Sequence, residues 1–523
     1  MPELEPFIVS APGKVIIFGE HSAVYAKPAI AAAISLRTYL MVAPSEDEED
    51  LTLEFPDIGL VHSWKRSSLP WEVVEKFSTS NKPTTTDELI PEVVSEISKL
   101  LSDMNQSIHY AASSSFLYLY VHLCNRQTKA KRFTVRSTLP IGSGLGSSAT
   151  ISVCLAGALS ILGQHIEPAT LGNNDKSVDN QDSEYIDSWA FMGEKLIQGN
   201  PSGIDNAVAT HGGAVMFQRT QSSVPSVRTT MRNFPKLKLL LTDTKQPRRS
   251  SDLVGNVSRL NSEYPKIISS ILNALEDIAR EGYSIMIKPN LDERARKRLS
   301  ELFEINHGLL VALGVSHPVL EKVRILTDEF KIGKTKLTGA GGGGCAITLI
   351  DDDVAESKIK ELIAKYDEFG FETFETSLGG KGVGYLNDLK IDSEGFLSLE
   401  SKEDIENAIG VDNVNEWKFC KRGGMTMIGV ALMTLEAAVS PTAYIAAVLE
   451  VPTSSPFSSK TEIPFLISSD LIAKTLTIPA LTTAANGTNL PKINFELAEI
   501  FFNLGTIEFK PNATPQDAVT AIV

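Results

Sequence analysis

The chain has 523 residues, of which 42% are hydrophobic and 22% charged, and it carries a formal net charge of -15 at pH 7. This length predicts two or three domains with sizeable cores, since domains usually run to roughly 100 to 200 residues. The acidic balance argues against broad binding of nucleic acid or of anionic membranes, because phosphate-rich partners need a positive surface. Any bound phosphate is therefore expected to be held locally, by backbone N–H groups, a lysine and a metal ion.

The cysteines and the first residues indicate a reducing compartment. The four cysteines are Cys124, Cys154, Cys345 and Cys420, and they show no CxxC or zinc-binding spacing. Two of them lie inside apolar runs, which is typical of reduced core thiols in a cytosolic protein. Residues 1–10 contain acidic groups and no basic segment followed by an apolar one, so no secretory signal is evident. We therefore predict a cytoplasmic protein.

The first 200 residues mix strand-like and helical patterns. Residues 7–21 contain strand-like runs around a Pro-Gly turn, and the small apolar residues 29–43 suit a strand or a helix. Residues 87–104 carry apolar side chains at helical spacing. Residues 172–184 are polar and charged, which predicts a solvated loop, and residues 188–199 predict a second helix that ends at a glycine.

The sequence LPIGSGLGSSAT is the first candidate for chemistry. Its alternating glycines, Gly142, Gly144 and Gly146, run into Ser147, Ser148 and an apolar segment typical of a buried helix. Such a junction leaves unpaired backbone N–H groups facing outward, with no Cβ to keep a phosphate at a distance. Alone, the pattern fits a flexible turn as well as a phosphate-binding loop.

Beyond about residue 230 the sequence alternates between strand and helix patterns. The predicted strands lie at 236–244, 334–351 (a strand-loop-strand) and 369–378, and the predicted helices at 266–280, 294–314, 317–330 and 356–366. This order suits a two-layer α+β unit of the split βαβ kind. The glycine run GAGGGG at 339–344 lies between two apolar strands, either as a plain hairpin loop or as backbone pressed against a ligand.

Residues 421–523 differ from the rest of the chain. They contain six basic and eight acidic residues and no His, Cys or Trp, so they offer few groups for chemistry. Glu436 and Pro441 interrupt their most apolar stretch below the roughly 18 to 20 residues that a membrane span needs. We predict no membrane span, and a small extra domain or interaction segment of unassigned function.

Three charged residues, Lys14, Glu194 and Asp205, suggest a function only when they are considered together. Each has an ordinary alternative: Lys14 as a surface lysine, Glu194 as an exposed helical carboxylate and Asp205 as a turn-forming aspartate. Phosphoryl transfer needs oriented N–H groups, Mg²⁺ on hard oxygen ligands, a cation and a carboxylate near the attacking hydroxyl. Here the glycine loop would hold phosphates, Ser148 and Glu194 would hold Mg²⁺, Asp205 would accept the proton and Lys14 would stabilise charge.

The sequence Gly-Lys-Thr, with which a Walker-type phosphate loop ends, occurs at residues 333–335, but the rest of that motif is missing there. That loop needs a glycine five residues before its Gly-Lys-Thr. Asp328 occupies this position before Gly333, Lys334 and Thr335. If the protein uses ATP, it therefore uses a different loop.

At these residues the chain resembles the GHMP small-molecule kinases. Three motifs in order carry the resemblance: APGKVIIFGEH at 11–21, LPIGSGLGSSA at 139–149 and KLTGAGGGGCAITL at 336–349. Three more segments point to the members that phosphorylate mevalonate: GEHSAVY, GEKLIQGNPSGIDNAVATHGG at 193–213 and TDTKQPRRSS at 242–251. The similarity covers roughly residues 5 to 385, thins towards Trp417 and does not reach the tail.

The resemblance implies a two-domain α+β GHMP kinase fold with ATP in the cleft between the domains. The implied parts are an N-terminal ribosomal-protein-S5-domain-2-like domain at 1–229, a ferredoxin-like C-terminal domain at 230–395, the end of the kinase body at 396–420 and the tail at 421–523.

The resemblance also implies the roles of individual residues. Lys14 and Asp205 match the catalytic residues, Ser148 and Glu194 the Mg²⁺ ligands, and His21 and Thr244 the mevalonate side. The implied ATP-binding residues are Lys14, Ser137, Gly142, Ser143, Gly144, Leu145, Gly146, Ser147 and Ser148, with a phosphate-side glycine hairpin at Gly339, Ala340, Gly341 and Gly342. Asp57 stands where animal members tend to have asparagine near the nucleotide base.

The implied reaction is transfer of the ATP γ-phosphate to the 5-hydroxyl of (R)-mevalonate, in isoprenoid and sterol synthesis. Members of the family are commonly cytosolic homodimers that prenyl diphosphates inhibit in competition with ATP. Two alternatives stay open. Another kinase of this fold would act on phosphomevalonate, homoserine or a sugar, and a non-catalytic sensor would bind the same ligands to engage a protein partner.

Overall fold

The computed structural model describes residues 5–419 apart from 78–79, 81, 87, 141, 168–180, 220–226, 232–233, 289–290 and 413–414. These residues fall in one compact unit, Met1–Gly424, whereas a second unit, Met425–Val523, lies outside them. The predicted tail and Cys420 are therefore outside the described residues. Cys124, Cys154 and Cys345 are free and buried, as predicted.

The N-terminal part contains seven strands and a set of helices among the described residues. The strands are β1 (Phe7–Phe18), β2 (Ala29–Pro44), β3 (Asp50–Phe55), β4 (Leu60–Lys65), β5 (Lys131–Ser137), β6 (Ala214–Gln218) and β7 (Val227–Met231). The helices are η1 (Ser22–Tyr25), η2 (Pro56–Ile58), η3 (Arg66–Ser68), α1 (Trp71–Glu75), α2 (Pro91–Leu100), α3 (Ser107–Leu123), α4 (Ser147–Leu162), α5 (Gln181–Gln198) and α6 (Ile204–His211).

The next part has the ferredoxin-like arrangement. Its elements are β8 (Leu237–Asp243), α7 (Ser250–Glu263), α8 (Pro265–Met286), α9 (Glu293–Ala312), α10 (Pro318–Phe330), β9 (Gly333–Leu337), β10 (Cys345–Ile350), α11 (Glu356–Asp367) and β11 (Glu372–Leu378). The strands lie in the order β11-β8-β10-β9 and all three pairs are antiparallel. The predicted split βαβ unit is therefore confirmed.

The chain then returns to the N-terminal sheet. The last described elements are β12 (Gly384–Leu386), α12 (Ser393–Leu397), α13 (Lys402–Ile409) and β13 (Lys418–Phe419). Strand β12 pairs with β1, and β13 pairs with β12. No helix in the described part of the chain is long and apolar enough to cross a membrane.

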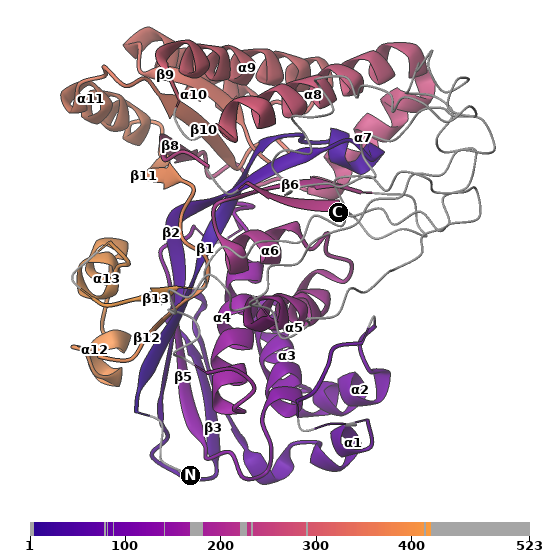
Figure 1. The fold of residues 1–523 in the computed structure, drawn as a ribbon, viewed down its shortest axis with the longest axis vertical. Helices are drawn as coiled ribbons and strands as arrows, with labels where there is room; N and C mark the ends of the chain where they lie inside the picture. The colour runs from indigo at the N-terminus through magenta and orange to yellow at the C-terminus, as the bar shows by residue number, and fades with distance from the viewer. Residues whose placement is uncertain are drawn as a thin grey trace, which may run out of the picture. The chain divides into compact units, whose positions relative to one another are not determined.

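Strand β2 connects the two halves of the sheet. Its 16 residues pair with β6 at one end, β5 at the other and β1 along most of its length. Between these, Ile34 pairs with Leu378 of β11. The N-terminal and ferredoxin-like sheets therefore share one continuous strand, which runs through the centre of Figure 1.

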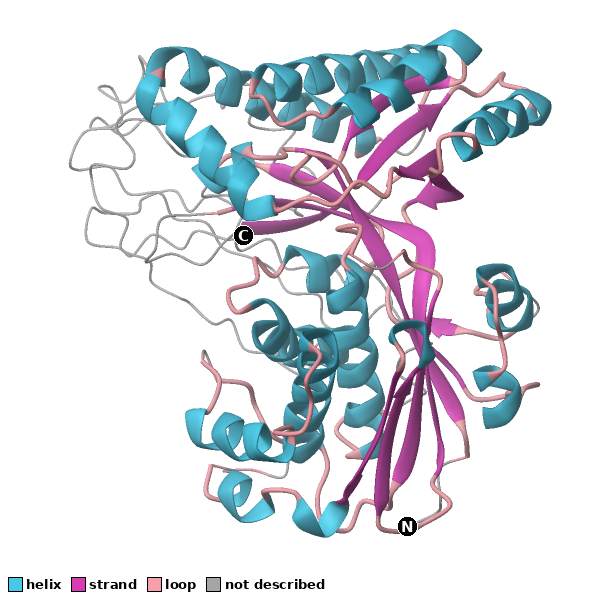
Figure 2. Cartoon of the chain, turned by 180° about the vertical axis from the view of Figure 1, so that it is seen from behind, coloured by secondary structure: helices cyan, strands magenta, loops and turns pink. Residues whose placement is uncertain are grey.

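Alternation along β1 explains the layers around the N-terminal sheet. Phe7 and Val9 join a core formed with α3, α4 and α5, whereas Ile8 faces a smaller core containing Phe396 and Ile405. Because successive side chains of a strand point to opposite faces, α12 and α13 cover the face opposite α3 to α5 (Figures 1 and 2).

Two predictions for local structure were wrong. Residues 7–18 form one strand through Pro12, with a register shift between Pro12 and Lys14 instead of a turn. A bulge tolerates a proline, which has no N–H to donate. Helix α5 begins at Gln181, inside the predicted loop at 172–184, and its first turn carries Asp182 and Glu184. Acidic residues favour a helix N-terminus, so the polarity of residues 181–184 belongs to a helix start, whereas residues 172–180 lie outside the described residues.

A fully buried ion pair connects the segment after β1 to the ferredoxin-like part. The Glu20 carboxylate pairs with the Lys336 ammonium and also accepts a 3.3 Å hydrogen bond from Asn306 Nδ2. Burial raises the pKa of Glu20 and lowers the pKa of Lys336, and the attraction between the two charges opposes both shifts. Removing either partner would leave an uncompensated buried charge, so β1 and β9 are held in a fixed relation.

Candidate active site

An ion pair between two segments far apart in sequence lies at the centre of the site. The Nζ of Lys14 on β1 is 3.3 Å from Oδ1 of Asp205, in the first turn of α6. The Lys14 backbone N–H donates to the carbonyl oxygen of Leu145, at 2.9 Å. One residue of β1 therefore contacts both the glycine-rich loop and α6.

Gly146 allows this approach because it has no side chain. Its φ of 77° is left-handed, and it directly precedes α4 as the N-cap. A Cβ built on it would lie 3.1 Å from Cγ of Lys14 and 3.7 Å from Oδ2 of Asp205. The start of α4 also has no side-chain cap. Its first N–H groups are therefore oriented as an anion site would require.

Glu194 adds a second carboxylate. It lies on α5 and is buried, and its Oε1 has no hydrogen-bond partner. Burial, and then the negative charge of Asp205, raise its pKa to about 7, while a hydrogen bond with Ser148 and the Lys14 charge act in the opposite direction. An unpartnered buried carboxylate oxygen beside a serine hydroxyl is suited to a hard divalent cation.

A cavity of about 270 Å³ opens next to these groups. Its lining residues are Glu194, Gln198, Asn200, Pro201, Ser202, Gly203 and Asp205. The Gln198 amide donates a 3.1 Å hydrogen bond to Oγ of Ser148. Both candidate metal ligands and the candidate base are therefore at or beside one hollow.

Arg248 joins the two glycine loops, and sequence reasoning missed it. Its guanidinium donates to the carbonyl oxygens of Ser143, at 3.0 Å, and Gly343, at 3.2 Å. A Cβ on Gly144 would lie 2.3 Å from Nη2 of Arg248. The signal was available in TDTKQPRRSS, where two arginines follow a proline, but only Thr244 was selected from it.

Two further predicted residues, His21 and Thr244, bind to the second glycine loop, at 339–344. His21 Nε2 lies 2.8 Å from the carbonyl oxygen of Ala340, and burial lowers the pKa of this histidine. Thr244 donates through Oγ1 to the carbonyl oxygen of Gly344, at 2.8 Å. Gly341 is left-handed, and its missing Cβ makes room for the carbonyl oxygen of Val315, which would be 2.0 Å away. Close backbone packing thus accounts for part of this glycine run.

Ser137 and Asp57 form a separate contact. The Ser137 backbone N–H donates to Oδ2 of Asp57 at 2.8 Å, and Nε of Arg136 is 3.2 Å from the other carboxylate oxygen. Burial raises the pKa of Asp57, and the Arg136 charge opposes that shift. The hydrogen bonds of the described residues do not connect this pair directly to Lys14 or Asp205.

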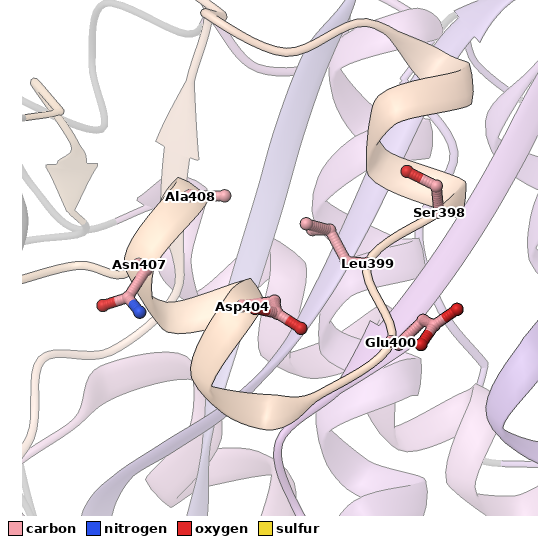
Figure 3. A pocket seen from close by; sticks show the side chains of 6 residues that line it. All are labelled: Ser398, Leu399, Glu400, Asp404, Asn407 and Ala408. Atoms are coloured by element: carbon pink, nitrogen blue, oxygen red, sulfur yellow. The ribbon is translucent and has the colours of Figure 1, made fainter.

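A larger hollow, of about 520 Å³, lies at α12 and α13 (Figure 3). It is lined by Ser398, Leu399, Glu400, Asp404, Asn407 and Ala408. This lining has no basic side chain and no glycine loop, and the Asp404 carboxylate caps the start of α13 with Ser401. It therefore offers nothing that would hold a phosphate.

Comparison with known families identifies two regions of the chain. Residues 115–213 match the model described as GHMP kinases N terminal domain, and residues 287–368 match GHMP kinases C terminal. The first match contains the glycine loop at 142–146 as well as Glu194 and Asp205.

Several mevalonate kinases align with this chain over nearly their whole lengths. The mevalonate kinase of Candida albicans is 54% identical over 426 residues, which are 79% of this chain and 99% of that protein. The mevalonate kinase of Saccharomyces cerevisiae is 43% identical, covering 76% and 94%. The human mevalonate kinase is 36% identical, covering 76% and 99%.

Solved structures match the fold. A crystal structure of a mevalonate kinase aligns with a TM-score of 0.51 and 23% identity, covering 71% of this chain and 98% of that one. The L. major mevalonate kinase in complex with R-mevalonate aligns with a TM-score of 0.51 and 22% identity, covering 71% and 96%.

The contact between Gly146 and Lys14 predicts a specific defect. Gly146→Ala should displace Lys14 and lower the rate of phosphoryl transfer by on the order of 10²-fold, the usual cost of a small misplacement in an active site. Its left-handed backbone should also cost roughly 1 to 2 kcal/mol of stability. Gly370→Ala is the matched control, since Gly370 has a φ of 73° and open space around its Cβ position. Urea unfolding and rate measurements on both variants check this, and equal rate losses would contradict it.

Proposed function

Because the chain belongs to the mevalonate kinase family of GHMP kinases, we propose that it transfers the γ-phosphate of ATP to the 5-hydroxyl of (R)-mevalonate. The products are 5-phosphomevalonate and ADP. The observation that carries the proposal is the Lys14–Asp205 ion pair, which lies against the glycine loop and beside Glu194. This arrangement supports the proposal, because a carboxylate that could act as a base, a cation and an uncapped helix start suited to a phosphate lie close together.

Asp205 is the proposed base. A hydroxyl is a poor nucleophile until its proton has an acceptor, and the Asp205 side chain is one-third exposed beside the cavity, with Lys14 at 3.3 Å. Lys14 holds the carboxylate in place through this contact. Its positive charge also offsets the charge that builds up on the phosphoryl group during transfer.

Ser148 and Glu194 are the proposed Mg²⁺ ligands. The unpartnered Glu194 Oε1 and the neighbouring Ser148 hydroxyl fit a cation that prefers oxygen ligands. A metal ion held by these two residues would supply positive charge that offsets the negative charge of the phosphates. Glu194 is buried on α5, which restricts the position of its carboxylate.

The glycine loops are the proposed phosphate site. Gly142, Ser143, Gly144, Leu145, Gly146 and Ser147 precede or begin α4, and Gly339, Ala340, Gly341 and Gly342 lie across from them through Arg248. His21 and Thr244, bound to the second loop, complete the mevalonate side. Ser137, with Asp57, belongs to the nucleotide side.

Four further parts of the proposal rest on the family resemblance. These are Mg²⁺ as the metal, a homodimer, a cytoplasmic location and competition of prenyl diphosphates with ATP. The acidic net charge does not oppose phosphate binding, because the basic groups of the site are local.

An acceptor panel tests the proposed reaction. ADP release from ATP should depend on added (R)-mevalonate, because the GNPSGIDN turn and the TDTKQPRRSS segment belong to its acceptor side. Phosphomevalonate, homoserine and galactose should give only the rate without acceptor. If ADP release depends on one of these three acceptors instead, that acceptor would replace mevalonate as the proposed substrate. ATP binding without release with any acceptor would favour the non-catalytic sensor.

The base assignment predicts the effect of Asp205→Asn. The amide cannot take up the hydroxyl proton, so kcat should fall by roughly 10² to 10⁴-fold, the scale of general-base catalysis. ATP should still bind, because the glycine loops are unchanged. Stopped-flow binding and steady-state rates check both statements, with the exposed Asp367→Asn as the control. Near-normal turnover of Asp205→Asn would rule out the base role.

The metal assignment predicts a different defect for Glu194→Gln. The amide loses the ligand charge, so the Mg²⁺ concentration for half-maximal rate should rise on the order of tenfold or more, the scale seen when metal sites lose a partner. Electron paramagnetic resonance of bound Mn²⁺ gives the affinity directly. The exposed Glu301→Gln on α9 is the control. An unchanged Mn²⁺ affinity for Glu194→Gln would contradict the assignment.

A further inference from the structure

A buried aspartate, Asp187, binds the residue that follows the proposed base Asp205. Asp187 on α5 is buried, and its Oδ1 accepts a 2.5 Å hydrogen bond from Nδ2 of Asn206. Its Oδ2 is 3.0 Å from Nη1 of Arg228 on β7. The same Asn206 amide also lies 3.3 Å from the Asp187 backbone carbonyl oxygen. Three elements, α5, α6 and β7, therefore meet at one carboxylate.

The position of Asp187 along α5 relates it to the catalytic groups. It lies seven residues before Glu194, which is about two helical turns, so both side chains are on the same face of the helix. That face meets the start of α6 at two neighbouring residues. The negative charge of Asp205 raises the pKa of Glu194, and the Asp187 carboxylate binds the next residue, Asn206.

Arg228 supports the turn that leads into α6. Gly203, the residue before the helix, is left-handed with a φ of 75°. A Cβ built on it would be 2.3 Å from Nη2 of Arg228. The guanidinium therefore packs directly against the glycine, while its other nitrogen binds Asp187. Helix α6 has eight residues and no side-chain cap at its start, so contacts from outside fix its first turn.

We propose that Asp187 is a positioning residue that fixes the catalytic geometry of Asp205 through Asn206 and Arg228. This inference rests on the proposed role of Asp205 as the base. The physical reason is that Asp205 is itself partly exposed and bound on one side, by Lys14, whereas the adjacent Asn206 is buried and held by a charged acceptor. Charge-assisted hydrogen bonds of this kind are short and strong.

A cation site at the same place is the competing interpretation. One ligand atom each of Glu184, Asp187 and His211 lies within 4.8 Å of the others. Both Asp187 oxygens are already engaged, one of them by the positive Arg228, and His211 pairs with Glu184 at 3.5 Å. An arginine in contact with the central ligand disfavours a metal, so the Asp187 carboxylate is engaged by Arg228 and Asn206 and not by a cation.

The test compares Asp187→Asn in two backgrounds. In the otherwise unchanged enzyme, kcat for mevalonate should fall roughly 10- to 100-fold, because misplacing a catalytic group costs on this order, while the KM for ATP changes less than about threefold. In an Asp205→Asn background the same substitution should lower the residual kcat less than about threefold. A residue that acts through Asp205 has nothing left to position there.

Two further variants keep the result interpretable. Glu184→Gln removes a neighbouring carboxylate that binds His211 and not Asn206, and it should keep kcat within about twofold. Arg228→Gln breaks the same network from its more exposed side and should repeat the Asp187→Asn pattern in both backgrounds. If thermal unfolding shows that Asp187→Asn does not fold, Arg228→Gln is used in its place.

The outcomes separate this inference from the proposed function. If Asp205→Asn alone keeps near-normal kcat, the base assignment fails, and the positioning role fails with it. If Asp205→Asn is slow but Asp187→Asn and Arg228→Gln are fully active, or lower kcat by equal factors in both backgrounds, the positioning role alone is overturned. Rate loss in the normal background, absent in the Asp205→Asn background, supports it.

Discussion

The site depends on how closely three chain segments approach one another around the Lys14–Asp205 ion pair. Strand β1 brings the lysine, α6 brings the aspartate, and the turn into α4 passes beside both at Gly146. A side chain larger than hydrogen at this glycine would lie against the lysine. The uncapped start of α4 and the charged pair are therefore adjacent because one position has no Cβ.

The rest of the fold keeps these segments in a fixed relation. Strand β2 belongs to both sheets, so the ferredoxin-like part extends from the sheet that carries β1. The buried Glu20–Lys336 pair holds the two parts together behind the site, and Arg248 holds the glycine loops together at the site. Burial makes the first of these contacts costly to break, since each buried charge would lose the opposite charge that compensates it.

The sequence predicted those residues whose chemistry is visible in a motif. Lys14, Ser148, Glu194 and Asp205 were expected in one site, and the structure brings them together. Arg248, Glu20 and Asp187 were not selected, because their importance comes from partners 19 or more positions away in the chain and on other elements. Helix α3 was also not expected: eleven of its residues are buried, so it lacks the polar face that makes a helix periodic in sequence.

The central claim is that the acceptor hydroxyl reacts between Lys14 and Asp205. A crystal structure with (R)-mevalonate and a non-hydrolysable ATP analogue measures this directly. The account predicts the 5-hydroxyl oxygen within about 3 Å of an Asp205 carboxylate oxygen, the hydrogen-bond reach that a general base needs, with the terminal phosphate at the start of α4. A hydroxyl bound away from Asp205, with another carboxylate in contact, would contradict the account.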